Sequence, residues 1–201
     1  MILAPTPALA VLLALGLQAP PDKPAQKPSD PQSTYEPRSG PGAGQKFMSQ
    51  FVGDWEVVKS FFPRSGEPVR MKGECRQTMI NDGRFLQSEF IFEYRGAKTT
   101  GLGLLGFEAD SGKFTSVWVD SRATRMSLRQ SREPFNGTEI VLYSQTLGDT
   151  KEARRSRTVT RLEDNGRKIV HRQYALSPDG KERLMMELLM TRKAKPAAPG
   201  R

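Results

Sequence analysis

The fold of this chain is decided by the stretch at residues 86–94, which reads LQSEFIFEY. Its residues alternate in character, and one face is formed by Leu86, Ser88, Phe90, Phe92 and Tyr94. A period of two is typical of a β-strand, whereas an amphipathic helix repeats its apolar positions every 3.6 residues. The stretch therefore predicts an extended strand with aromatic side chains on one face.

The same alternation recurs in later segments, at 114–120, 139–143 and 183–190. Turn-forming residues separate the segments, at 63–66, 81–83, 110–112, 136–137, 164–166 and 178–180. Asn-Gly and Asp-Gly pairs supply the positive φ angles of tight hairpins. This spacing predicts an all-β fold, an antiparallel up-and-down meander of about eight to ten strands. A sheet of that size closes into a barrel or folds into a sandwich, because open edges invite aggregation.

The N-terminal residues 1–19 have features of a signal peptide. The apolar run from Ala8 to Leu17 has the length of a signal-peptide core and is too short for a membrane-spanning helix. No Lys or Arg precedes this run, and Pro20 would follow a cut after Ala19. We expect an exported protein, located in the periplasm or outside the cell.

The remaining chain divides by composition into a folded part and two tails. Residues 20–46 are rich in Pro, Ser, Gly, Gln and Lys, which predicts a disordered tether. Residues 194–201 have the same character and predict a disordered tail. The β-barrel domain is therefore expected at 47–193, with a short helical lead-in at 47–51.

Charge and the rarer residue types limit the classes of function. The chain has 31 Lys and Arg against 22 Asp and Glu, a formal charge of +9, which favours weak contact with an anionic envelope surface. No helix-turn-helix, zinc-finger or RNP pattern accompanies this charge, so no specific nucleic-acid partner is predicted. Cys75 is the only cysteine and His171 the only histidine, so the sequence predicts no internal disulfide, no metal site and no cofactor.

His171 lies in an extended run, between Val170 and Arg172. Small haem-binding barrels do use a single histidine from a late strand. A lone histidine on a strand is more often a surface residue or a hydrogen-bonded polar residue, and that is the interpretation we favour here.

Gly53, Trp55 and Arg192 are predicted to close the barrel. Lipocalins and fatty-acid-binding barrels carry a Gly-x-Trp at the start of the first strand, with a late Arg or Lys stacked on the indole. Here Arg192 is the late cation, and a planar guanidinium on an indole makes a good cation–π pair. The expected role of the three residues is structural.

Further motifs extend over most of the folded part: Val52-Gly53-Asp54-Trp55, Gly83-Arg84-Phe85-Leu86-Gln87-Ser88, Gly101-Leu102-Gly103-Leu104-Leu105-Gly106-Phe107, Val117-Trp118-Val119-Asp120, Pro178-Asp179-Gly180-Lys181 and Met185-Met186-Glu187 leading to Thr191-Arg192. In this combination the segment from Phe51 to Lys193 resembles the bacterial domain-of-unknown-function family 1579. Phe107 and Met190 stand where that family often has Tyr. The resemblance implies a lipocalin-like β-barrel, and it implies no activity, because none is established for the family.

Gly101, Gly103 and Gly106 do not form a phosphate-binding loop. Such a loop needs a strand before it and a helix after it, whereas a hairpin turn follows here. Glycines in a strand more often allow a bend or a close backbone approach.

Trp118 and Asp120 share a face with Phe114 and Ser116. If that face is the interior, a carboxylate lies beside an indole in a cavity. A buried Asp must be paired or have a raised pKa. Arg84, Arg122 or Arg125 could pair with it. Asp120 would then either be part of a buried salt bridge or serve as a polar anchor for a ligand headgroup.

The function that we favour is binding of a small apolar or amphipathic ligand inside the barrel. The candidate cavity residues are Phe90, Phe92, Trp118, Asp120 and Met186. The alternative is a structural or interaction protein of the envelope with a filled barrel. An enzyme that uses a buried carboxylate, Asp120 or Glu74, is a less favoured hypothesis.

Overall fold

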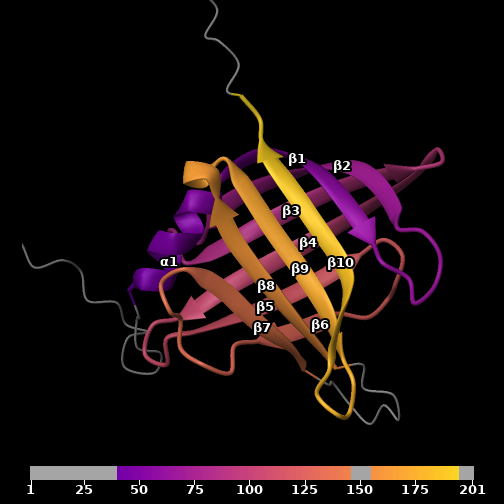
Figure 1. The fold of residues 1–201 in the computed structure, drawn as a ribbon. Helices are drawn as coiled ribbons and strands as arrows, with labels where there is room; N and C mark the ends of the chain where they lie inside the picture. The colour runs from indigo at the N-terminus through magenta and orange to yellow at the C-terminus, as the bar shows by residue number, and fades with distance from the viewer. Residues whose placement is uncertain (1–39, 146–154, 195–201) are drawn as a thin grey trace, which may run out of the picture. The chain divides into compact units, whose positions relative to one another are not determined.

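Ten antiparallel strands form one closed barrel within the residues that the computed structural model describes, 40–145 and 155–194 (Figure 1). Each strand pairs with the next along the chain, and β1 pairs with β10 to complete the ring. The strands are β1 (Gly53–Phe61), β2 (Val69–Ile80), β3 (Phe85–Tyr94), β4 (Ala97–Glu108), β5 (Lys113–Asp120), β6 (Ser127–Gln130), β7 (Glu139–Gln145), β8 (Ser156–Glu163), β9 (Lys168–Leu176) and β10 (Glu182–Arg192). The expected antiparallel meander and lipocalin-like barrel are confirmed, and every described strand has a paired neighbour on each side.

Tight turns allow consecutive strands to pair. The hairpin between β2 and β3 places Asn81, Asp82 and Gly83 at φ values of 50°, 55° and 77°. Asn, Asp and Gly adopt this left-handed region at the least cost. The turn residues of the sequence thus set the up-and-down order, and a 3₁₀ turn, η3 (Asp164–Gly166), joins β8 to β9.

A short helix covers one end of the barrel, which we call the closed end. Helix α1 (Ala43–Met48) and the 3₁₀ turn η2 (Ser49–Phe51) precede β1. Gln45 Nε2 donates a hydrogen bond to the backbone carbonyl of Phe107, at 2.8 Å, and Phe47 and Phe51 are buried. These contacts seal the barrel on this side.

The helix begins at Ala43, whereas the sequence placed the lead-in at 47–51 and assigned residues up to 46 to the tether. Two contacts hold this earlier start in place: Gln45 caps the helix by accepting from the Gly42 N–H at 2.8 Å, and Gly44 lies directly against the Phe107 ring. The expected signal peptide, most of the tether and the tail from residue 195 lie outside the described residues. Among the helices that are described, none is long and apolar enough to cross a membrane.

The two ends of the barrel differ in their interior. The closed end is filled by aromatic rings, with Phe114 lying 4.8 Å from Phe107 and 5.2 Å from Phe135 between ring centres. Because β1 leaves the closed end and the strands alternate in direction, β1, β3 and β5 all finish at the opposite end, which we call the loop end. Space that these rings do not fill runs through the barrel, from Phe51 at the closed end to Asp120 at the loop end.

Candidate functional site

A cavity of about 510 Å³ lies inside the barrel and receives side chains from all ten strands. This volume falls within the range of about 300–1,000 Å³ that is usual for small-molecule sites. The five cavity residues singled out from the sequence all line it: Phe90, Phe92, Trp118, Asp120 and Met186. The period-two pattern put these side chains on particular strand faces, and the structure shows that those faces are the interior.

One wall of the cavity is aromatic. The rings of Phe90 and Phe92 on β3 are stacked, with centres 5.6 Å apart, and Trp118 on β5 meets Phe90 edge-on at 5.5 Å. The indole lies across β4, where a Cβ atom on Gly101 would come within 2.3 Å of Trp118 Cη2. The glycine thus permits the close approach that puts this flat apolar surface inside the barrel.

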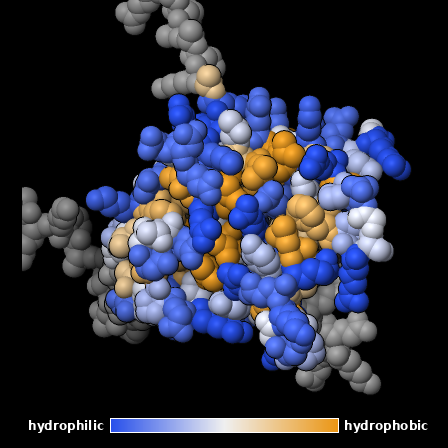
Figure 2. All heavy atoms as spheres, in the orientation of Figure 1, coloured by the Kyte–Doolittle hydropathy of each residue, from blue (hydrophilic) through white to orange (hydrophobic). Residues whose placement is uncertain are grey.

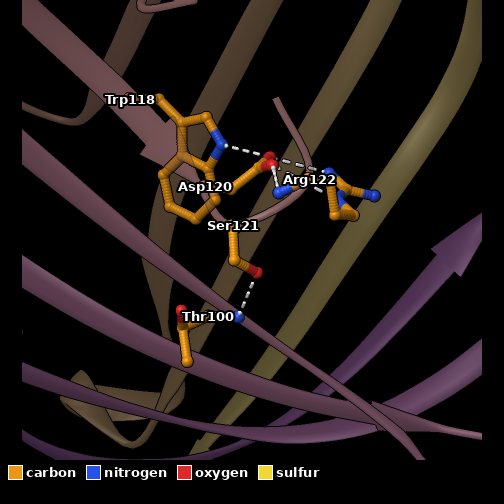
Figure 3. A network of polar contacts seen from close by, with 5 residues as sticks. All are labelled: Thr100, Trp118, Asp120, Ser121 and Arg122. Atoms are coloured by element: carbon orange, nitrogen blue, oxygen red, sulfur yellow. Dashed lines mark hydrogen bonds and ion pairs between the residues drawn. The ribbon is translucent and has the colours of Figure 1, made fainter. Parts of the chain in front are cut away.

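Asp120 holds Trp118 and the start of the following loop (Figure 3). Its carboxylate accepts hydrogen bonds from Trp118 Nε1 at 3.1 Å, from the Arg122 backbone N–H at 2.9 Å and from Arg122 Nη2 at 2.8 Å. These bonds, with the Arg122 side chain foremost, hold the pKa of Asp120 well below its usual range. Of the three arginines considered from the sequence, Arg122 is the partner.

The geometry gives neither candidate carboxylate the properties of a general acid or base. Such a group needs a pKa near the working pH, whereas the pKa of Asp120 is lowered and its oxygens are occupied. Glu74 points to the outside of the barrel, where its side chain is 67% exposed and lies 2.6 Å from Lys193 Nζ. Asp120 is better described as a fixed polar group at the rim of the cavity.

His171 points into the cavity from β9. Its Nδ1 lies 2.7 Å from Thr160 Oγ1 on β8, so the expectation of a hydrogen-bonded polar residue fits the structure and a surface position does not. Burial, followed by the charges of Arg129 and Lys59, lowers the pKa of His171 to about 4. The imidazole is therefore neutral at physiological pH.

The polar residues of the cavity that were not singled out from the sequence include Lys59, Gln77 and Arg129. Lys59 is only 6% exposed, and both Gln77 Oε1 and Arg129 Nε are buried without a hydrogen-bond partner among the described residues. Lys59 could have been predicted as a cavity residue from the alternation of β1, which places its side chain on the same inward face as that of Trp55. Sequence reasoning gave this pattern too little weight, because a charged residue on a strand is usually solvated.

Arg192 closes the barrel beside Trp55, away from the cavity lining. Its guanidinium carbon lies 4.1 Å from the centre of the Trp55 ring, and Trp55 is fully buried. The guanidinium donates hydrogen bonds to the carbonyls of Val52 at 2.5 Å and Gly166 at 2.9 Å. Gly53 has a φ of 139° and lies against this guanidinium, so a side chain there would collide with it.

Comparison with solved structures finds barrels of the same fold at low sequence identity. The crystal structure of Rv2717c from M. tuberculosis matches with a TM-score of 0.56 and 13% identity, over 78% of this chain and 100% of that one. The S-type phycobiliprotein lyase CPES from Guillardia theta matches with a TM-score of 0.51 and 11% identity, over 76% of this chain and 93% of that one. At such identities the likeness extends to the fold alone.

Comparison with curated protein sequences gives no match. Residues 40–192 match the family described as "Protein of unknown function (DUF1579)", which covers most of the chain and all ten strands. The family assignment agrees with the resemblance carried by the sequence motifs. The chain belongs to the DUF1579 family.

Proposed function

We propose that this protein binds a small amphipathic ligand inside its barrel. The observation that carries the proposal is the cavity of about 510 Å³, which the side chains of the described residues leave open. An aromatic wall and a set of polar side chains face the same space, and sites for amphipathic molecules have this mixed lining. The likeness of the fold to a phycobiliprotein lyase is consistent with a role in ligand binding.

A second candidate, an interaction protein of the cell envelope, has weaker support. Figure 2 shows hydrophobic residues gathered in the middle of one face, with hydrophilic residues around them. Strand register places Val58, Leu189 and Val170 in one row on the outside of β1, β10 and β9. An ion pair between Arg172 and Glu187, at 2.7 Å, borders this row. The open interior favours the ligand-binding proposal, because a purely structural barrel would have its lumen filled.

Export is part of the proposal. The apolar run from Ala8 to Leu17 and the Pro-rich stretch that follows it support a signal peptide and a periplasmic or extracellular location. Fractionation of cells that express the full chain, or a chain that starts at residue 20, tests this. We expect only the full chain outside the cytoplasm, and equal cytoplasmic retention of both would overturn the assignment.

Native mass spectrometry tests ligand binding most directly. The protein is purified from its own cells without refolding, and we expect an added mass that is lost on denaturation. The variant Ser116→Phe fills the cavity and should lose this mass. The matched control Thr115→Phe adds the same ring on the outer face of β5 and should keep it. A bare chain mass, together with no stabilisation by a panel of amphiphiles, would overturn the proposal.

A further inference from the structure

Positive charge is in excess inside the cavity. Among the described lining residues the cations are Lys59, Arg122, Arg125 and Arg129, and the single carboxylate is Asp120. Asp120 is already paired, because it accepts hydrogen bonds from the Arg122 guanidinium. The lining therefore carries cationic charge that the described residues do not balance.

Lys59 is the first unbalanced cation. It enters from β1 with only 6% of its surface exposed, and its Nζ lies 4.5 Å from the centre of the Phe92 ring and 4.9 Å from that of Phe61. It forms no ion pair with any residue in the described ranges. Contact with aromatic faces compensates a buried ammonium only in part, and a paired anion would stabilise it further.

Arg129 is the second unbalanced cation. It enters from β6, and its Nε is buried without a hydrogen-bond partner among the described residues. A guanidinium stays charged at any ordinary pH, so it cannot relieve this cost by losing its proton. A buried, unsatisfied donor on a charged group is unfavourable unless an acceptor reaches it.

The two cations approach the same space from opposite walls. Strand β6 stands five positions from β1 in the ring of ten strands. The charges of Lys59 and Arg129 both act on His171 of β9, since each of them lowers the pKa of its imidazole. A single acidic group held between the two walls could contact both Lys59 and Arg129, with the neutral His171 beside it.

We propose that the ligand is an amphipathic organic anion whose acidic group binds between Lys59 and Arg129 and whose apolar body lies against Phe90, Phe92 and Trp118. This inference rests on the proposed function and specifies its ligand class. An acidic headgroup supplies the acceptors that both cations lack, and a guanidinium fork suits a carboxylate or a phosphate. The aromatic wall accepts a flat or chain-like apolar body.

Binding of an anion would also be linked to the protonation of Lys59. Burial and the charge of Arg122 lower the pKa of Lys59 to about 8, against the opposing effect of Asp120. A bound anion favours the charged ammonium and raises this pKa, so binding above pH 8 takes up a proton. The affinity of the wild type should fall as the pH rises beyond 8.

Calorimetric titration of the full chain tests the inference with three probes of equal chain length: dodecanoate, dodecyl phosphate and dodecanol. At pH 7 we expect at least one of the two anions to bind tenfold or more tightly than the alcohol, and their order tells a carboxylate site from a phosphate site. Lys59→Met and Arg129→Met should each weaken anion binding at least tenfold and leave dodecanol binding unchanged or stronger. Lys72→Met, which removes the same charge from the outer face of β2, is the matched control and should bind as the wild type does.

Proton uptake is the second measurement. Titrations at pH 8.5 in two buffers of different ionisation enthalpy should report uptake in the wild type and none in Lys59→Met. Dodecanol binding as tightly as both anions, or Lys59→Met and Arg129→Met binding the anions like the wild type, would overturn the anion site and leave ligand binding intact. Failure of all three probes, together with a bare mass from native cells, would instead overturn the proposed function.

Discussion

At the scale of single residues, His171 makes the stability of the ligand-free protein depend on pH. Its pKa is lowered from 6.5 to about 4, so the unfolded chain binds a proton that the folded barrel excludes. This contribution to stability is fully present above about pH 6.5 and is lost as the pH falls toward 4, by about 1.4 kcal/mol for each pH unit in that window. Urea unfolding between pH 7 and pH 4 should therefore show a falling free energy of unfolding. In His171→Gln this part of the fall should be absent.

The comparison is clean because the chain contains no other histidine. Carboxylates with lowered pKa values, such as Asp120 and Glu182, begin to lose their stabilising effect near their ordinary pKa values, and they do so equally in the wild type and in His171→Gln. The charges that face His171 are Arg129 and Lys59, and both remain protonated throughout the window. Identical pH profiles for the wild type and His171→Gln would contradict a neutral imidazole inside the barrel.

Sequence reasoning located apolar site residues better than charged ones. Alternation placed Phe90 and Trp118 in the cavity, because aromatic residues at every second position have an evident reason to be buried. Lys59 and Arg129 follow the same alternation, but a strand cation is ordinarily solvated, and burying one without a partner is costly. A charged residue among the apolar residues of an interior face is therefore a good indicator of a binding site. Such a residue is recognised only once the closed ring of strands shows which face is interior.

At the scale of elements, Gly44 determines how closely α1 approaches the barrel. A Cβ atom at this position would lie 2.2 Å from Phe107 Cγ, too close for the ring to move aside without shifting the helix. Helix propensity alone would make Gly44→Ala stabilising by about 1 kcal/mol. Overpacking costs about 1–3 kcal/mol, so we expect net destabilisation, by roughly 1 kcal/mol, in urea unfolding. The control Gly40→Ala, with no atom within 4 Å, should leave the free energy of unfolding nearly unchanged.

The same helix marks the limit of sequence prediction for elements. Hairpin turns such as the one at 81–83 were found because their residues favour the required φ angles locally. Helix α1 has only six residues and draws its stability from contacts with β4, including the bond from Gln45 to Phe107. A helix this short is unstable in isolation, and the sequence around it is rich in Gly. The sequence alone therefore predicts a disordered tether at this position. A stabilising effect of Gly44→Ala would show that the tertiary contact is not what holds α1.

At the scale of the whole molecule, the formal charge of +9 and the unpaired cations of the cavity act on different steps of anion binding. The overall charge attracts an anion over distances that salt screens, with a screening length of about 10 Å at 0.1 M. The contacts with Lys59 and Arg129 form inside the barrel, where screening is weak. Rising salt should therefore slow association of dodecanoate several-fold and change its dissociation rate little. Stopped-flow fluorescence of Trp118 can follow both rates, because the indole lines the cavity.

Dodecanol provides the control, since an uncharged probe should associate at the same rate at low and high salt. Arg129→Met lowers the total charge by only one unit, so its association rate should stay close to that of the wild type while dodecanoate dissociates faster. This separation follows from the position of the charge: a cation held at mid-barrel contributes to retention more than to encounter. Equal salt dependence for the acid and the alcohol would mean that charge does not guide entry, and the excess of basic residues would then serve the outer surface of the protein.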